Sequence, residues 1–177
     1  MNIWHDLDPG KKAPEEITVA IEVPTGSQNK YELDKESGMV KLDRVLYSPM
    51  HYPGDYGLIP KTLWLDGDPL DVLVLTTNPL LPGVLADVRP IGVLKMVDNG
   101  EEDDKIIAVP IEDPRFNEIK DIKHISEHKR KEIKHFFEVY KHLQNVKVTV
   151  HEEFLNKKEA IKVIKKGLEL YKKEFNK

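Results

Sequence analysis

The sequence predicts a mainly β fold of the α+β class, in which a small closed β-barrel precedes two C-terminal helices. The front of the chain consists of short β-branched runs separated by turn residues, which is typical of a small barrel. The back of the chain has apolar residues at helical spacing. With 177 residues, the chain is long enough for one core and short for two. We therefore expect a single domain over residues 1–177.

The expected strands are short and are bounded by turn residues. Pro24-Thr25-Gly26 and Ser37-Gly38 separate the first ones, and prolines at positions 79, 82 and 90 exclude long helices from the middle of the chain. Asn99-Gly100 lies between two apolar runs and predicts a hairpin that joins antiparallel strands. In chain order, the expected strands cover residues 17–23, 30–33, 39–42, 72–76, 84–97, 105–109 and 146–150.

Two helices are expected after the strands. Ser126 is the expected N-cap of the first, and Asn156, with Glu159 three residues on, begins the second. The apolar face of the first helix is Ile133, Phe136, Phe137, Tyr140 and Leu143. The apolar stripe of the second, which we expect to be structural, is Ile161, Ile164, Leu168, Tyr171 and Phe175.

Composition restricts the classes of protein to consider. Apolar residues at 40% and charged residues at 33% are typical of a globular protein. No apolar run is long enough to cross a bilayer, and the first residues do not resemble a signal peptide, so we expect a cytoplasmic protein. The absence of cysteine excludes disulfides and thiolate metal sites. The formal charge of -4 gives no overall attraction to nucleic acid.

The most informative motif is Asp66-Gly67-Asp68-Pro69-Leu70-Asp71. Three carboxylates this close repel one another unless a cation lies among them, and short carboxylate arrays suit Mg²⁺. An acidic solvated turn is the alternative. An EF-hand loop starting at Asp66 is excluded, because its sixth and twelfth positions are Asp71 and Thr77. An aspartyl-phosphate phosphatase is disfavoured, because the apolar strand follows the aspartates.

A second acidic cluster covers residues 98–104, at the expected hairpin. Alone, such a cluster is more often solvated surface than a site. If both acidic loops open on the same end of the barrel, their carboxylates converge into a nest that can hold more than one metal. The converging side chains would be Asp66, Asp68, Asp71, Asp98 and Asp103.

Basic and phenolic side chains could bind an anion at such a nest. Lys30, Arg44 and Lys105 are candidate phosphate donors, although a single such residue is more often a surface cation. Tyr52 and Tyr56 lie in a turn-rich segment, where an aromatic pair usually packs beneath a loop. A phenol can also donate a hydrogen bond to a phosphoryl oxygen without adding charge.

Short polar blocks follow one another in a specific order along nearly the whole chain. They are Ile21-Glu22-Val23-Pro24, Lys30-Tyr31-Glu32, Asp43-Arg44, Tyr52-Pro53-Gly54-Asp55-Tyr56-Gly57, the residue 66–71 motif, Gly92-Val93-Leu94-Lys95-Met96 and His135-Phe136-Phe137-Glu138-Val139-Tyr140-Lys141. In order and spacing these blocks resemble the soluble family I inorganic pyrophosphatases. Position 55 is Asp where some members carry Asn, which we expect to make the rim of the site slightly more acidic.

This resemblance implies an OB-like barrel that hydrolyses inorganic pyrophosphate to two orthophosphates with Mg²⁺. It implies Asp68 as the general base for the attacking water. It implies a homo-oligomer, commonly a hexamer. The implied metal ligands are Asp66, Asp71, Asp98, Asp103 and Glu32. The implied substrate-binding residues are Lys30, Arg44, Tyr56, Lys105, Tyr140 and Lys141.

Two other functions stay open at this point. A non-catalytic barrel that binds phosphorylated ligands or nucleic acid would place more basic and aromatic residues than acids in its groove, and this chain has the reverse. A metal-dependent phosphatase acting on other phosphorylated small molecules would need an adenine or sugar pocket, for which the sequence gives no signal. The histidines lack an HExxH pattern, which disfavours zinc.

Overall fold

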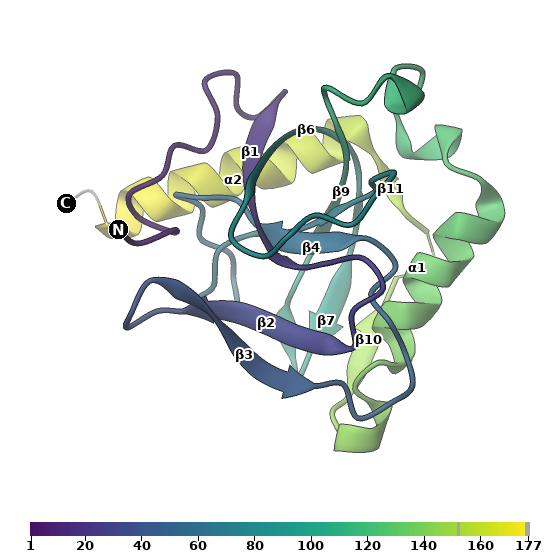
Figure 1. The fold of residues 1–177 in the computed structure, drawn as a ribbon. Coiled ribbons are helices and arrows are strands. Elements are labelled where there is room, and N and C mark those ends of the chain that lie inside the picture. The colour runs from purple at the N-terminus through teal and green to yellow at the C-terminus, as the bar shows by residue number, and fades with distance from the viewer. Residues whose placement is uncertain (152, 176–177) are drawn as a thin grey trace.

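The computed structural model describes residues 1–151 and 153–175. Five strands form a closed barrel in the order β1 (Ile17–Val23), β4 (Asp55–Leu58), β5 (Asp71–Val74), β9 (Lys105–Pro110) and β6 (Leu85–Leu94), and pairing of β1 with β6 closes it (Figure 1). The β5–β9 pair is parallel, whereas the other barrel pairs are antiparallel. A short strand, β11 (Leu155–Asn156), extends the sheet beside β6. The predicted barrel with two C-terminal helices is confirmed.

Two smaller sheets lie outside the barrel. The hairpin of β2 (Asn29–Asp34) and β3 (Met39–Val45) forms its own two-stranded sheet beside the barrel (Figure 1). The other sheet joins β10 (Val148–Val150), β7 (Met96–Asp98) and β8 (Glu101–Glu102). The β7–β8 turn has positive φ at Asn99 (49°) and Gly100 (90°), which confirms the predicted hairpin.

The expected long strand over residues 84–97 is divided into two. It breaks at Lys95, between β6 and β7, and these two strands belong to different sheets. The Lys95 amine pairs there with the buried carboxylate of Asp104. The break therefore lets the chain leave the barrel and build the hairpin that carries the second acidic cluster.

Both helices begin where the sequence predicts. The Ser126 hydroxyl accepts a hydrogen bond from Lys129 N at 3.2 Å at the start of α1 (Glu127–Val139). Asn156 Oδ1 accepts one from Glu159 N at 3.2 Å at the start of α2 (Lys157–Phe175). Three short 3₁₀ helices complete the described elements, at Pro114–Phe116, Ile122–His124 and His142–Gln144.

The two helices cover separate hydrophobic clusters. Phe136, Phe137 and Tyr140 join one cluster, and α2 covers the other through Ala160, Val163 and Ile164. Strand β5 contributes to both, with Leu73 in the first and Val72 and Val74 in the second. This strand is therefore buried on both faces, as its uninterrupted apolar run indicates.

Two predicted helix faces are partly wrong. Leu143 is 63% exposed, because α1 ends at Val139 and Leu143 lies in a 3₁₀ turn with a different spacing. In α2 the buried face includes Gly167, whose backbone carbonyl accepts from Leu63 N at 3.0 Å. Ile161 and Leu168 lie only half-buried beside this face, and Phe175 is exposed. The close approach of a loop to Gly167 rotates the buried face away from the expected stripe.

Strand β4 was not predicted, and neither was the burial of Asp55. The turn-like segment 52–57 contains β4, whose Gly57 pairs with Ile21; a Cβ at Gly57 would lie 2.1 Å from the Ala20 carbonyl oxygen. Asp55 is fully buried and accepts from Thr25 N at 2.8 Å and Leu80 N at 3.0 Å. The expectation of a more acidic rim is therefore wrong, because this carboxylate fastens loops to the barrel.

Within the described residues, the helices are too short or too polar to cross a membrane.

The barrel's close strand packing can be tested with a pair of glycine variants. Gly57→Ala should lower the free energy of unfolding by roughly 1 to 3 kcal/mol, because its methyl group collides with backbone. Gly167→Ala should raise it by about 0.5 to 1 kcal/mol, because its methyl group would meet Thr62 Cβ at an ordinary 3.5 Å and alanine favours the helix. Chemical denaturation measures both values, and equal effects in the two variants would contradict this packing.

Candidate active site

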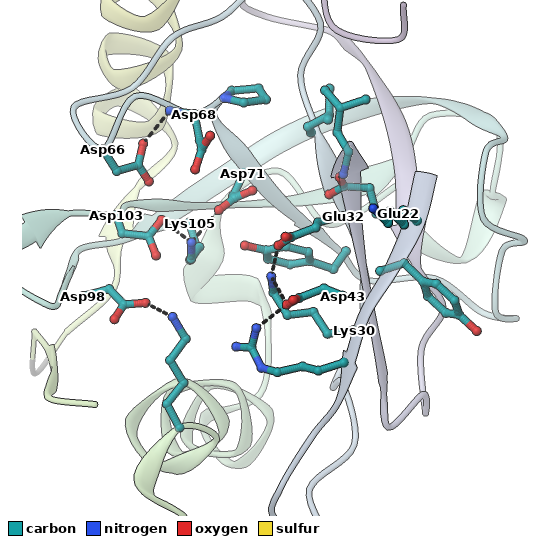
Figure 2. Close-up of a pocket in the computed structure, with 18 of the residues that line it drawn as sticks. Glu22, Lys30, Glu32, Asp43, Asp66, Asp68, Asp71, Asp98, Asp103 and Lys105 are labelled. Carbon is teal, nitrogen blue, oxygen red and sulfur yellow. Dashed lines mark hydrogen bonds and ion pairs between the residues drawn. The ribbon is translucent and has the colours of Figure 1, made fainter. Parts of the chain in front are cut away.

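One cavity of about 880 Å³ is lined by every residue that the sequence analysis assigned to the site. The β2–β3 hairpin forms one side, and the loops containing the two acidic clusters form the other (Figure 2). The expected side chains that line it are Lys30, Glu32, Arg44, Tyr56, Asp66, Asp68, Asp71, Asp98, Asp103, Lys105, Tyr140 and Lys141. The condition set by the sequence, that both acidic loops open on one end of the barrel, is met.

The first acidic cluster is a turn followed by a strand. Asp66 Oδ1 accepts from Asp68 N at 3.0 Å, and Gly67 between them has φ of +83°, which favours glycine. Trp64 N donates to Asp68 O at 2.7 Å and closes the turn. Asp71 is the first residue of β5, so its carboxylate is held by the barrel itself.

A buried lysine lies at the base of the acidic side. Lys105 is 1% exposed and stands opposite Asp71 in the parallel β5–β9 register. Its amine donates to Asp71 Oδ2 at 2.5 Å and to the Asp103 carboxylate, as Figure 2 shows. Burial acts to lower the pKa of Lys105, but the two carboxylates outweigh it and hold this pKa well above its usual range. The lysine is therefore charged.

Two other carboxylates, Asp66 and Asp98, lie where an added cation would stabilise them. Burial, with Asp103 and Asp71 nearby, raises the pKa of Asp66 to about 7. One oxygen of Asp98 pairs with Lys141, and the other is buried without a hydrogen-bond partner among the described residues. A set of carboxylate oxygens of this kind fits a hard divalent cation.

The described carboxylates on this side of the cavity are not grouped around one metal position. Within residues 1–151 and 153–175, no three Asp, Glu or His side chains are placed to hold one metal ion. The amines of Lys105 and Lys141 stand instead among the oxygens of Asp71, Asp98 and Asp103. The five carboxylates expected to converge thus all line the cavity, but lysine amines separate their oxygen atoms.

The hairpin side supplies the expected cations. Lys30 and Arg44 face each other across the β2–β3 register, and both pair with Asp43; Lys30 also pairs with Glu32. Arg44 Nε is buried and has no hydrogen-bond partner among the described residues. Arg44 therefore has one N–H donor that the described residues leave unpaired.

The tyrosines combine packing with access to the cavity. Tyr140 is 4% exposed and stacks on Phe136 with ring centroids 5.2 Å apart, yet it lines the cavity beside Lys141. Tyr56 also lines the cavity, whereas Tyr52 packs against Phe136 and does not. Tyr140 and Tyr56 are therefore packed side chains that also line the cavity.

The cavity has further lining residues that had no role in the sequence analysis, and Glu22, Asp43 and Lys35 are among them. Glu22 was visible as the one charged residue in the apolar strand 17–23. It is 5% exposed, and its Oε1 accepts from Leu33 N at 2.6 Å, which joins the barrel to the hairpin. Burial, followed by the charge of Asp71, raises the pKa of Glu22 to about 8. Lys35 had no comparable signal among the many lysines of the chain.

Glu22 should make the metal-free protein less stable as pH rises. Its pKa is about 8 in the folded chain against 4.5 as the ordinary value, so the folded state binds more protons between these values and loses stability through this window. Glu22→Gln keeps the acceptor for Leu33 N and removes the ionisation. In chelator, the unfolding free energy of Glu22→Gln minus that of the parent chain should grow from about pH 5 to pH 8. A difference that stays constant with pH would contradict this burial.

Comparisons with known proteins agree on one family. A family model described as inorganic pyrophosphatase matches residues 19–172. An inorganic pyrophosphatase of Geobacillus stearothermophilus is 61% identical over 134 residues, which are 76% of this chain and 81% of that protein. Soluble inorganic pyrophosphatase 2 of Chlamydomonas reinhardtii is 48% identical over 172 residues, covering 97% of this chain and 89% of that one.

Solved structures give the same result for the fold. The crystal structure of inorganic pyrophosphatase from Thermus thermophilus matches with a TM-score of 0.93 and 47% identity, over 97% of this chain and 99% of that one. The Helicobacter pylori pyrophosphatase matches with a TM-score of 0.89 and 45% identity, over 94% of this chain and 99% of that one. The chain belongs to the inorganic pyrophosphatase family.

Proposed function

We propose that this protein hydrolyses inorganic pyrophosphate to two orthophosphates with Mg²⁺. The observation that carries the proposal is a single cavity with a carboxylate side and a cationic side. Pyrophosphate is a compact polyanion that repels an attacking hydroxide, so a site for it must both neutralise the phosphates and prepare the water. Family membership supports a divalent metal cofactor in general, and the oxygen-only donor set favours Mg²⁺.

The acidic side would hold the metal ions. Asp66, Asp71 and Asp103 are the proposed main ligands, with Asp98 and, from the hairpin side, Glu32 completing further sites. The lysine amines now paired with these oxygens would then become available to the phosphates. When bound, Mg²⁺ lowers the pKa of a coordinated water toward neutrality and offsets phosphate charge. The orphaned oxygen of Asp98 and the raised pKa of Asp66 support this assignment, because both signal oxygens short of positive charge.

The chain's own residues would carry out the remaining work. Asp68 is the proposed general base, which accepts the proton of the attacking water. Its carboxylate is 53% exposed and lies apart from the buried pairs around Lys105, so it is open to a solvent molecule. The phosphates would be bound by Lys30, Arg44, Tyr56, Lys105, Tyr140 and Lys141.

We also propose that the protein is a cytoplasmic homo-oligomer, a hexamer by family resemblance. The large apolar side chains of Leu81 and Leu85 are 72% and 51% exposed, which supports contact with another copy. The formal charge of -4 and the carboxylates of the cavity argue against nucleic acid as a partner.

A phosphate-release panel tests the proposed activity. With Mg²⁺, release from pyrophosphate should exceed release from ATP and from a simple phosphomonoester. A preference for ATP or for the monoester would assign the cavity to a phosphatase of other substrates instead. Binding of pyrophosphate without release under every metal condition would indicate a non-catalytic phosphate-binding barrel.

One pair of variants distinguishes the proposed role of Asp68 from that of the neighbouring metal ligands. Asp68→Asn keeps the shape and removes the basicity, so the rate should fall by roughly 10² to 10⁴ while Mg²⁺ affinity changes little. Asp71→Asn should instead weaken Mg²⁺ binding, with activity partly restored at high Mg²⁺. Calorimetry with Mg²⁺ and steady-state kinetics measure both. If Asp68→Asn loses Mg²⁺ as severely as Asp71→Asn, Asp68 is a ligand and the base is another group.

A further inference from the structure

Lys35 bridges the two sides of the cavity. It follows β2 in the turn of the β2–β3 hairpin, and its amine pairs with the Asp68 carboxylate on the opposite loop. The same amine donates to the Gly67 carbonyl at 3.3 Å and lies 5.6 Å from the centre of the Trp4 ring. The Lys35 side chain thus contacts both the acidic loop and the N-terminal segment.

Trp4 is a fixed platform beneath Lys35. It is 4% exposed, its indole N–H donates to Thr62 O at 2.6 Å, and its carbonyl accepts from Lys61 N at 2.8 Å. The adjacent Ile3 N donates to Gly38 O at 3.4 Å, in the same hairpin turn as Lys35. The N-terminal segment therefore holds both the hairpin turn and the segment that leads into the acidic loop. A cation above an indole face is attracted by the ring, so the position of Lys35 is favoured by Trp4 as well.

The Asp68 carboxylate has a different lysine partner from the other carboxylates of the acidic side. Asp71 and Asp103 are oriented by the buried Lys105, and Asp98 by Lys141 at the end of α1. In the described part of the chain, the Asp68 carboxylate pairs with Lys35 alone. Because this carboxylate is half exposed on a turn, little packing fixes its rotamer, and its orientation rests on the lysine.

The hairpin also needs this connection. Strands β2 and β3 form a sheet of their own, so no described strand ladder fixes them to the barrel. Glu22 holds the hairpin near Leu33, and Lys35 holds its turn at the acidic loop. Lys30 and Arg44 lie at the other end of the same hairpin. The contact between Lys35 and Asp68 therefore also sets how the cationic side of the cavity faces the acidic side.

We propose that Lys35, seated over Trp4, is a positioning residue that holds the Asp68 carboxylate in its working orientation and ties the β2–β3 hairpin across the cavity. The inference rests on the proposed role of Asp68 as base. It assigns no contact between Lys35 and the substrate. An ion pair this exposed contributes little to folding stability, so its loss should appear in the rate and not in the melting temperature.

Single variants give the first test. Lys35→Met should lower kcat about tenfold, as expected for a base that is slightly misplaced, while the melting temperature stays nearly unchanged. KM should rise by a smaller factor, because the hairpin that carries Lys30 and Arg44 loses one of its contacts with the acidic loop. Lys35→Arg keeps the charge and the contact with the indole, and should recover most of the lost rate. The matched control is Lys12→Met, which removes the exposed Lys12–Glu16 pair and should leave kcat unchanged. Parental kcat in Lys35→Met, or a rise in KM alone, would overturn the proposal.

A double variant separates this role from the proposed function. If Lys35 acts through Asp68, adding Lys35→Met to Asp68→Asn should cause no further loss of kcat. An undiminished further loss would overturn the positioning role and leave pyrophosphate hydrolysis intact. Full activity of Asp68→Asn alone would remove the base assignment, and this proposal with it, while the phosphate-release panel would still report the substrate.

Discussion

The parallel register of β5 and β9 is the constraint on which the site depends. It sets Asp71 opposite Lys105, so the first residues of two barrel strands form a charged pair at the base of the cavity. Asp103, two residues before Lys105, completes the pair into a three-membered cluster. Burying one of these charges alone would be costly, and the cluster persists because every member has an opposite charge in contact. The barrel thereby fixes the positions from which both acidic loops extend.

The charged side chains of the cavity pair with one another. An incoming metal and an incoming anion would each take over one member of these pairs. On the acidic side, lysine amines stand among the carboxylates; on the hairpin, Asp43 holds Lys30 and Arg44. A divalent cation would compete for the carboxylates, and a phosphate would compete for the amines and the guanidinium. Binding of one ligand would therefore favour binding of the other, which is the coupling expected at a metal-dependent phosphate site.

Much of this organisation could be predicted from the sequence because the signals were local. Ser126 and Asn156 mark their helix starts, and Asn99-Gly100 marks its hairpin, since caps and turns depend on neighbouring residues. The site residues were predicted as a set from the family resemblance that the polar blocks carry, and all of them line one cavity.

What could not be predicted depends on contacts between distant segments. Strand β4 exists because Gly57 lets the chain approach Ala20, and Asp55 is buried because three segments converge on it. The lysine amines that separate the carboxylates, and the contact of Lys35 with Trp4, likewise join residues far apart in sequence.

We infer that the acidic side is built for an added cation, because the lysines of the chain only partly offset its carboxylates. Asp66 tests it most directly, and the measurement is the unfolding free energy of Asp66→Asn beside that of the parent chain, in chelator and in Mg²⁺. We expect the variant to be at least as stable as the parent in chelator and less stable in Mg²⁺. A variant that is less stable in chelator, or one that gains as much from Mg²⁺ as the parent does, would contradict it.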